Sequence, residues 1–346
     1  MKMYLGFCLF FFAAIVLGED QFIMPPLDRR YDHVCWLASH NAYAAEKHGY
    51  IYANQYYTLA EQLERGVRQF ELDLEKKGSR IRVCHGSYTL NKFIQPFKKH
   101  IDFKKKVLSL FKEFLEKHPH EIITITIENR VTKCGILDDH LEQSGIAYLI
   151  LKPADWNPIA KEGWPTLQWM VEHNKRLILF NDIPPHKQGF YTHLPFAATK
   201  YTYFQWATIA QNQWAGVKDF SVALKERLHS KTEHKGCVRY LFEFDHFALG
   251  GKILGGSFSR FLDKLAYGYT PFVTNYKKIN GPKLQALFER FLKEGLDTGI
   301  LKGRYPNFIK VDYFNEGNPM KLVNYINELA NDPEKRIAMF SPIYPH

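Results

Sequence analysis

The sequence predicts an α/β protein with one domain, folded as a TIM-like (β/α) barrel. Strand-like and helix-like segments alternate along the chain, which is typical of a parallel sheet with crossover helices. About seven or eight such units follow one another, enough to close a barrel, and barrels of this length often form a single domain. Polar residues also recur directly after several of the strand-like segments. The number of units favours the barrel over an open sheet, and in a barrel the polar residues would converge at one end.

The expected strands are short apolar runs, or runs that alternate with a period of two. They cover residues 33–39, 69–74, 81–84, 122–127, 176–180, 241–244 and 308–311. The expected helices cover residues 59–65, 103–117, 166–173, 284–296 and 320–329. No glycine-rich phosphate fingerprint follows the first strand, which disfavours a dinucleotide-binding sheet. The stretch 184–235 is aromatic and irregular, and its elements are not predicted.

The first 18 residues read as a secretory signal peptide, which leaves residues 19–346 as the domain. Lys2 provides a positive start, and residues 4–17 form an almost unbroken apolar run. This run is shorter than the roughly 20 residues that a membrane span needs. We therefore expect a secreted or extracytoplasmic protein, periplasmic or extracellular, without a transmembrane segment.

The chain is basic, with a formal net charge of +10. Lysines cluster at positions 98, 99, 104, 105 and 106. The cluster is either a solvated helix face or a patch attracted to anionic lipid, where each basic residue contributes about 1 kcal/mol. No recognition motif indicates nucleic-acid binding, and we expect a monomer.

Four cysteines follow the signal peptide, and an exported protein permits disulfides between them. Cys35 and Cys84 lie in apolar, strand-like runs and are expected in the core. Cys134 and Cys237 lie in loop-like segments and are the pair expected to form a disulfide.

Ionisable and amide side chains follow the predicted strands and would meet at one end of a parallel barrel. That end is where barrel enzymes place their chemistry. The side chains are His40, Asn41, Glu71, Asp73, His85 and Glu128.

Glu71 and Asp73 are two residues apart on a strand and therefore point the same way. Two neighbouring carboxylates repel each other unless a proton or a cation lies between them. Together with Glu128 and the Asn41 carbonyl they supply four oxygen donors, which suit calcium or magnesium. An irregular shell completed by water or substrate favours calcium over magnesium. The alternative is neutralisation of the carboxylates by arginines nearby in the sequence, namely Arg68, Arg82 and Arg130.

His40 and His85 would lie beside this oxygen-rich site. Cleavage of a phosphodiester by an internal hydroxyl requires one proton to be removed from the nucleophile and another to be given to the leaving oxygen. Imidazoles that titrate near neutrality suit both tasks.

Six sequence motifs in order resemble a known family. They are Ser39-His40-Asn41, Gln62-Leu63 with Gly66-Val67-Arg68, Glu71-Leu72-Asp73, Cys84-His85-Gly86, Ile127-Glu128-Asn129, and Trp164-Pro165-Thr166-Leu167 with residues 175–180. This set is similar to the X domain of phosphatidylinositol-specific phospholipases C. The resemblance covers about residues 34–182 strongly and extends weakly to Phe314.

The resemblance implies that the inositol 2-hydroxyl attacks phosphorus, releasing diacylglycerol and a cyclic inositol phosphate from a phospholipid at a membrane surface. It implies that His40 is the base or a stabiliser of the charged transition state, with Glu71 as the other candidate base. His85 would be the acid for the leaving oxygen. Calcium would be bound by the four oxygen donors named above. Metal-independent members of the family carry arginine where Asp73 stands, which favours calcium here.

The remaining positions leave alternatives open. Asn181 and Asp182 follow a strand after which many relatives carry Lys or Arg, which disfavours a polyphosphorylated substrate. Arg130 and Lys133 are candidates for supplying positive charge to the substrate. Asp312 either orients His40 or has a structural role.

Two other functions compete with this interpretation. One is a different phosphodiesterase on the same barrel, such as a glycerophosphodiesterase or a sphingomyelinase D-like enzyme. The other is a non-catalytic lipid-binding relative that keeps the fold. The lipid head group is not predicted.

Overall fold

The computed structural model describes residues 21–50, 52–84, 101–131, 135–188, 193–194, 196–212, 241–246, 252–253, 276–289 and 306–331. The signal peptide, His85, Lys133 and both cysteines of the predicted disulfide lie outside these ranges. Cys35 and Cys84 are buried in the core, as the sequence predicts, and form no disulfide with a described residue. No helix among the described residues is long and apolar enough to cross a bilayer.

The strands are β1 (Trp36–Ser39), β2 (Tyr52–Ala53), β3 (Gln69–Lys77), β4 (Arg80–Val83), β5 (Ile101–Asp102), β6 (Ile123–Asn129), β7 (Leu177–Asn181), β8 (Tyr203–Phe204), β9 (Ile209–Gln211), β10 (Leu241–His246), β11 (Lys252–Ile253) and β12 (Phe308–Val311). The α-helices are α2 (Leu59–Glu64), α3 (Ser109–Lys117), α4 (Ile136–Gln143), α5 (Leu167–Glu172), α6 (Gln205–Thr208), α8 (Tyr276–Lys278) and α10 (Pro319–Leu329). The 3₁₀-helices are η1 (Tyr31–His33), η2 (Glu46–His48), η5 (Ala147–Leu149) and η6 (Pro185–Gln188). The π-helical segments are η4 (Phe103–Leu108) and η8 (Ile279–Lys283).

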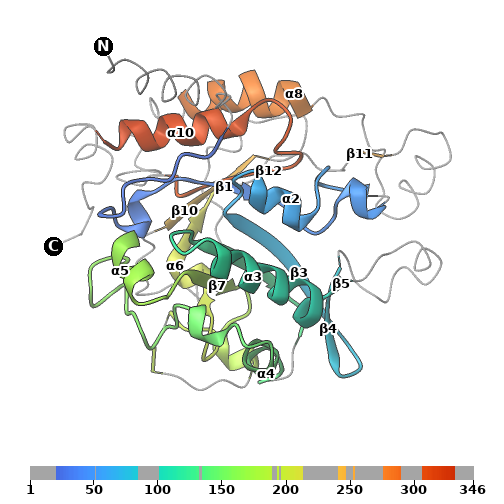
Figure 1. Ribbon diagram of the computed structural model, residues 1–346, viewed down its shortest axis with the longest axis vertical. Helices are drawn as coiled ribbons and strands as arrows, with labels where there is room; N and C mark the ends of the chain where they lie inside the picture. The colour runs from blue at the N-terminus through green and yellow to red at the C-terminus, as the bar shows by residue number, and fades with distance from the viewer. Residues whose placement is uncertain are drawn as a thin grey trace, which may run out of the picture.

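The main sheet is parallel and curls into a barrel. Its strands follow the order β8-β7-β6-β3-β1-β12-β10-β9, so the first strand, β1, pairs with the last, β12. The strands occupy the centre of the molecule and the helices surround them (Figure 1). Within the part of the chain that the structure describes, no ladder joins β8 to β9, and the sheet is open there. The predicted barrel class is confirmed.

Alternation along the strands separates an apolar outer face from a polar interior. On β3, Phe70, Leu72 and Leu74 belong to the hydrophobic core under the helices, whereas Glu71 and Asp73 point to the other face. Lys310 of β12 follows the same rule and is 2 % exposed, between the core residues Ile309 and Val311. The barrel interior therefore gathers charged side chains from distant parts of the sequence.

One predicted strand, residues 81–84, is not part of the parallel barrel. β4 pairs antiparallel with the end of β3 and forms a hairpin. The prediction that His85 follows a parallel strand is therefore wrong, because alternation alone does not reveal strand direction. The backbone N–H of Cys84 donates to the Asp73 carbonyl at 3.1 Å, so the chain returns to the carboxyl end of the barrel strands immediately before His85.

Candidate active site

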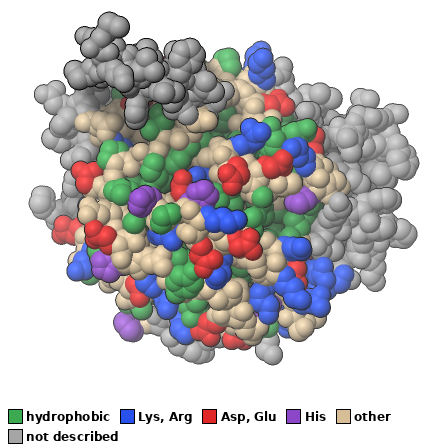
Figure 2. Space-filling model, viewed as in Figure 1, with side chains coloured by type: hydrophobic (Ala, Val, Ile, Leu, Met, Phe, Trp, Pro, Cys, Tyr) green, Lys and Arg blue, Asp and Glu red, His purple; other side chains and the backbone are tan. Residues whose placement is uncertain are grey.

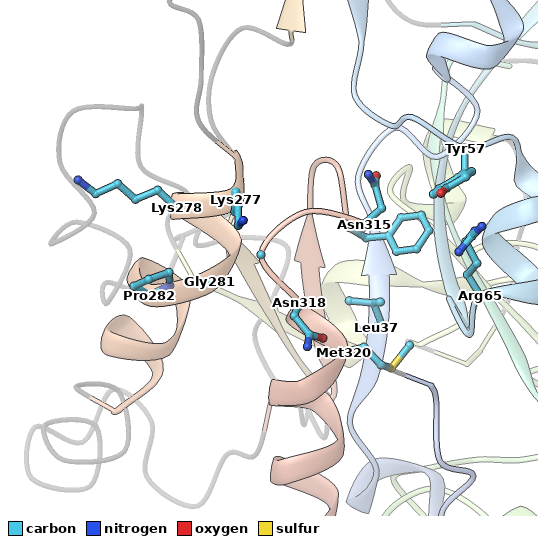
Figure 3. A pocket seen from close by; sticks show the side chains of 12 residues that line it. Leu37, Tyr57, Arg65, Lys277, Lys278, Gly281, Pro282, Asn315, Asn318 and Met320 are labelled. Carbon is cyan, nitrogen blue, oxygen red and sulfur yellow. The ribbon is translucent and has the colours of Figure 1, made fainter. Parts of the chain in front are cut away.

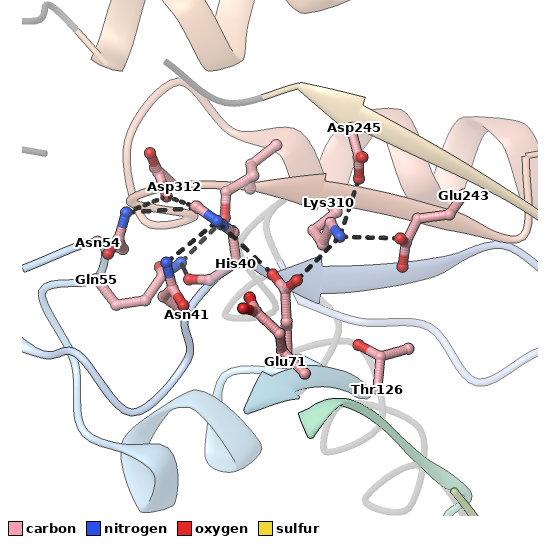
Figure 4. A network of polar contacts seen from close by, with 12 residues as sticks. His40, Asn41, Asn54, Gln55, Glu71, Thr126, Glu243, Asp245, Lys310 and Asp312 are labelled. Atoms are coloured by element: carbon pink, nitrogen blue, oxygen red, sulfur yellow. Dashed lines mark hydrogen bonds and ion pairs between the residues drawn. The ribbon is translucent and has the colours of Figure 1, made fainter. Parts of the chain in front are cut away.

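His40 follows β1 and is held from both sides. Its Nδ1 atom lies 2.8 Å from Oδ1 of Asp312, directly after β12, and its Nε2 atom lies 3.7 Å from Oε2 of Glu71 on β3 (Figure 4). The side-chain amide of Asn54 donates to the same Asp312 oxygen at 3.0 Å and fixes the carboxylate. The side-chain amide of Gln55 donates to the backbone carbonyl of His40 at 2.9 Å. The imidazole is therefore positioned before any ligand binds.

The surroundings of His40 favour its protonated form. Burial opposes the charged imidazole, but the carboxylates of Asp312 and Glu71 outweigh it and raise the pKa of His40 to about 9. Burial likewise opposes the charged form of Glu71, yet Lys310 and His40 hold the pKa of Glu71 below its usual range. At neutral pH this pair consists of an imidazolium and a carboxylate.

The mouth of the barrel, at the carboxyl ends of its parallel strands, has two halves that differ in charge. Lys310 is the buried cation at the centre of the half around β10 and β12. Its Nζ atom lies 2.8 Å from Glu243, 3.1 Å from Asp245 and 3.5 Å from Glu71 (Figure 4). Glu243 also accepts hydrogen bonds from the amides of Gln69 at 2.5 Å and Gln211 at 2.8 Å. One ammonium therefore serves three carboxylates from β3 and β10.

Burial raises the pKa of Asp245 to about 8, despite its contact with Lys310 and because Glu243 and Glu71 are close. Asp245 can therefore hold a proton at neutral pH.

The other half of the mouth is acidic. Asp73 on β3 and Glu128 on β6 are register partners, so their side chains leave the sheet side by side. Burial and the neighbouring Asp73 raise the pKa of Glu128. Burial also raises the pKa of Asp182 to about 7, although the Asn129 N–H donates to its Oδ1 at 2.8 Å, and Glu128 and Asp73 add to the rise. Within the described residues Arg130 is the basic partner of this group, 2.6 Å from Glu128.

The oxygen donors suit a hard cation, which is the chemistry predicted for calcium. Asp73, Glu128 and Asp182 repel one another, and a divalent ion would relieve this. The described residues nevertheless contain no group of three or more His, Cys, Asp or Glu side chains arranged to hold a metal. Asn41 accepts from the Tyr43 hydroxyl at 3.3 Å, and its amide nitrogen lies 3.1 Å from His40 Nε2. The donor types thus fit calcium, and metal binding stays a prediction.

The structure brings together most of the predicted site. His40, Asn41, Glu71, Asp73 and Glu128 lie at the carboxyl ends of neighbouring parallel strands, β1, β3 and β6. Asp312 has the contact with His40 that an orienting role requires, and the role itself stays a prediction. His85 and Lys133 lie outside the described residues. The alternative of arginine pairing holds for Glu128 with Arg130, whereas Arg68 pairs with Glu121.

Sequence reasoning missed Lys310 as the partner of Glu71, and it also missed Glu243 and Asp245. A signal for Lys310 existed, because it lies on β12 two residues before Asp312, which directly follows that strand, and the period of two gives both side chains the same direction. Glu243 and Asp245 have the same spacing on β10. Their pairing with Lys310 depends on β10 lying beside β12, which the sequence does not state.

A family model described as PI-PLC X matches residues 27–222 of this chain. The chain belongs to the PI-PLC X family. The match includes β1, β3 and β6, the strands that carry His40, Glu71 and Glu128. The suspected resemblance is thereby confirmed at the level of the family.

Relatives of this PI-PLC X protein are distant. It is 28 % identical over 165 residues to a PI-PLC X domain-containing protein of Arabidopsis thaliana, covering 44 % of this chain and 36 % of that protein. It is 25 % identical over 181 residues to PI-PLC X domain-containing protein 1 of Arthroderma benhamiae, covering 51 % and 54 %. The chain thus spans about a third to a half of the length of these curated relatives.

The fold of this PI-PLC X protein is shared with a solved bacterial enzyme. The phosphatidylinositol-specific phospholipase C from Listeria monocytogenes superposes with a TM-score of 0.53 at 14 % identity, covering 90 % of this chain and 98 % of that one. At this identity the likeness establishes the fold alone.

Proposed function

We propose that this PI-PLC X protein is a secreted phosphodiesterase that cleaves phosphatidylinositol, or a related inositol phospholipid, by cyclisation. The inositol 2-hydroxyl oxygen forms a bond to phosphorus, and the bond from phosphorus to the glycerol oxygen breaks. The products are diacylglycerol and a cyclic inositol phosphate. Family membership supports the reaction class, and the single observation that carries the proposal is the His40 arrangement at the barrel mouth.

His40 serves in this proposal as a cation. Asp312 and Glu71 keep the imidazole protonated at neutral pH, so it stabilises negative charge on the phosphoryl oxygens rather than taking up a proton. Glu71 is the base that accepts the proton of the 2-hydroxyl. Its Oε2 atom is buried, faces the His40 imidazolium at 3.7 Å and accepts no hydrogen bond from the described residues, which leaves this oxygen able to accept one from the substrate.

His85 is proposed to protonate the leaving glycerol oxygen. Cys84, the residue before it, is hydrogen-bonded beside Asp73. Arg130 and Lys133 are proposed to contribute positive charge toward the substrate.

Calcium is the proposed cofactor, held by Asn41, Glu71, Asp73 and Glu128. When bound, it would lower the pKa of the attacking hydroxyl and offset charge on the phosphoryl group. The protein's own contribution is to hold the oxygen donors on β1, β3 and β6 and to keep the imidazolium facing them.

The test is hydrolysis of phosphatidylinositol followed by phosphorus NMR, with chelator and then with calcium or magnesium added back. A cyclic phosphodiester that appears only after calcium is restored is the expected result. A phosphate monoester product, or release of free inositol without a cyclic phosphate, would identify another barrel phosphodiesterase. A folded protein that binds the lipid and turns over none would be a non-catalytic relative.

A histidine-matched pair of variants links the activity to the site. His40→Ala removes the imidazole between Asp312 and Glu71. His120→Ala removes an exposed imidazole between α3 and β6. Activity that survives His40→Ala as well as it survives His120→Ala would remove the main support for the proposal.

A further inference from the structure

The β3–β4 hairpin extends beyond the barrel mouth. β3 pairs with β6 only from Gln69 to Leu74, and its last three residues, through Lys77, continue past the end of that ladder. At the usual rise per residue these three residues carry the tip about 10 Å past the sheet. The turn that follows passes through Gly78, whose φ of +64° favours glycine. The tip therefore lies beyond the same end of the barrel at which Glu71 and Asp73 are found.

The tip of the hairpin is basic and exposed. Lys76, Lys77 and Arg80 are all exposed, and Lys77 is the register partner of Arg80. Like charges directly opposite each other on paired strands destabilise a hairpin. The exposed positive charge of the tip gives this surface the sign that suits an anionic partner.

A second basic element lies beside the first. β5 pairs with β4 through Arg82 and Asp102, and the chain then enters η4, where Lys105 and Lys106 are exposed. The Asp102 side chain accepts from the backbone N–H of Lys105 at 2.9 Å and caps the helix, and its single negative charge offsets only part of the positive charge on this element.

We name the five exposed side chains on these two elements the basic rim. They are Lys76, Lys77, Arg80, Lys105 and Lys106. In the space-filling view Lys and Arg side chains gather at the lower right, where Figure 1 places β4, β5 and the start of α3 (Figure 2). The acidic residue on the hairpin, Glu75, is half-buried and accepts from the Cys84 thiol at 3.2 Å, away from the tip.

We propose that the basic rim is a docking surface for an anionic membrane leaflet, separate from the residues that take the scissile lipid. The inference rests on the proposed function in one respect, because docking there would turn the barrel mouth toward the lipid. Lysine and arginine near an anionic leaflet are attracted by its surface potential, and this attraction falls off within a Debye length. The hairpin tip extends beyond the mouth of the barrel, so it is the part of the protein that first comes within a Debye length of the leaflet.

A groove lined by Arg65, Lys277 and Lys278 is another basic feature of the described residues, and it gives weaker support for a docking surface (Figure 3). It lies between α2 and the α8–η8 segment, and Leu37 and Met320 contribute apolar lining. Lys278 points away from the groove in the close view. Nothing in the described residues indicates what would occupy it, so the basic rim is the stronger candidate.

The test measures binding of the full mature chain to vesicles that contain no inositol lipid, so that turnover plays no part. Phosphatidylcholine vesicles with and without phosphatidylglycerol are sedimented at two salt concentrations. One variant, K76E/R80E, alters the hairpin, and another, K105E/K106E, alters η4. We expect each to reduce partitioning onto anionic vesicles by about tenfold or more, and the remaining binding to weaken with salt.

The matched control is K117E/K161E, which changes the net charge by the same amount at the other end of the barrel. Lys117 ends α3 just before β6 begins. Lys161 lies in the segment that follows Ile150, whose bridge partner is Leu177 at the start of β7. The control should bind nearly as the wild type does. Equal losses in the control and the rim variants, or unchanged binding in the rim variants, would overturn the docking surface.

A soluble substrate keeps this test apart from the test of the proposed function. Rim variants should cleave a short-chain, monomeric phosphatidylinositol at the wild-type rate and lose activity only on anionic vesicles. Rim-dependent binding in a protein that cleaves no inositol phosphodiester would leave the docking surface standing and end the proposed function. Rim variants that lose both activities equally would show that the rim residues serve the site itself and would refute a separate docking surface.

Discussion

The two halves of the barrel mouth differ in how the negative charge of their carboxylates is compensated. Around β10 and β12, Lys310 neutralises carboxylates inside the protein, with Glu243 and Asp245 as its nearest partners. Around the ends of β3, β6 and β7, Asp73, Glu128 and Asp182 crowd together, and the pKa values of Glu128 and Asp182 are raised. Glu71 lies between the halves and belongs to the first through Lys310.

The two halves differ in whether a buried cation is present, because burial raises the pKa of a carboxyl group, that of Asp245, in the Lys310 half as well. The Lys310 half carries its own cation and a fixed imidazolium. In the acidic half, burial and mutual repulsion disfavour the charged carboxylates, so binding of a proton or a metal ion would stabilise this half. The proposed calcium therefore has its electrostatic reason in the acidic half, and the following predictions separate the two.

Removing the imidazole should have the largest effect on activity. His40→Ala is expected to lower kcat for phosphatidylinositol cleavage about 10²–10³-fold, because removing one positioned group that stabilises transition-state charge costs on this scale. The measurement is steady-state kinetics, with circular dichroism to show that the variant is folded. A loss below about tenfold would place His40 outside the chemistry.

The pH profile distinguishes a cationic His40 from a basic one. With a pKa of about 9 in the folded protein, the imidazolium is present at neutral pH, and activity should fall as pH rises through 9. Asp312→Asn removes one of the two carboxylates that raise this pKa, so the fall should move to lower pH. Activity that instead climbs steadily toward pH 9 would assign the role of base to His40.

Removing the central cation should have the largest effect on stability. Lys310→Met leaves Glu71, Glu243 and Asp245 without their ammonium partner and should lower the free energy of unfolding by about 3–5 kcal/mol. Arg130→Met is the matched change in the acidic half. Its ion pair with Glu128 is partly exposed, so the expected loss is below about 1 kcal/mol. Urea denaturation measures both, and equal losses would erase the difference between the halves.

Calcium should stabilise the protein through the acidic half. At a concentration 100 times its Kd, a ligand that binds only the folded state adds about 2.7 kcal/mol. The double variant D73N/E128Q should abolish the calcium-dependent rise in melting temperature. The control E113Q/D139N neutralises two exposed carboxylates of α3 and α4 and should retain the rise. A rise that persists in D73N/E128Q would place the ion elsewhere.

The smallest expected effect concerns Asp182. Its pKa is about 7 when folded and near its ordinary value when unfolded, so the folded state binds the proton more tightly. The stability from this group is complete below the ordinary pKa of aspartate, about 4, and is lost progressively as pH rises from there to 7. Asp182→Asn keeps an oxygen that can accept from the Asn129 N–H and removes the titration. Its melting temperature should exceed that of the wild type at pH 8 more than at pH 5, without calcium; an equal difference at both pH values would contradict the shift.

The sequence by itself determined the strand-and-helix order and half of the site. Alternation in residues 69–74 places Glu71 and Asp73 on one face, and the β-branched run before Glu128 predicts a buried strand that ends at the same edge. His40 and Asn41 follow from the first strand in the same way. These features are local, because side-chain direction depends on the period of two within one strand.

Only the tertiary structure decided which charges meet and in which direction β4 runs. Asp312 reaches His40 across 272 positions of sequence, and Glu243 reaches Lys310 across 67, because the last strand closes on the first and β10 lies beside it. Asp182 joins Glu128 only through the pairing of β6 with β7. Such contacts depend on strand order and register, which are set by long-range packing and leave no periodic trace in the sequence.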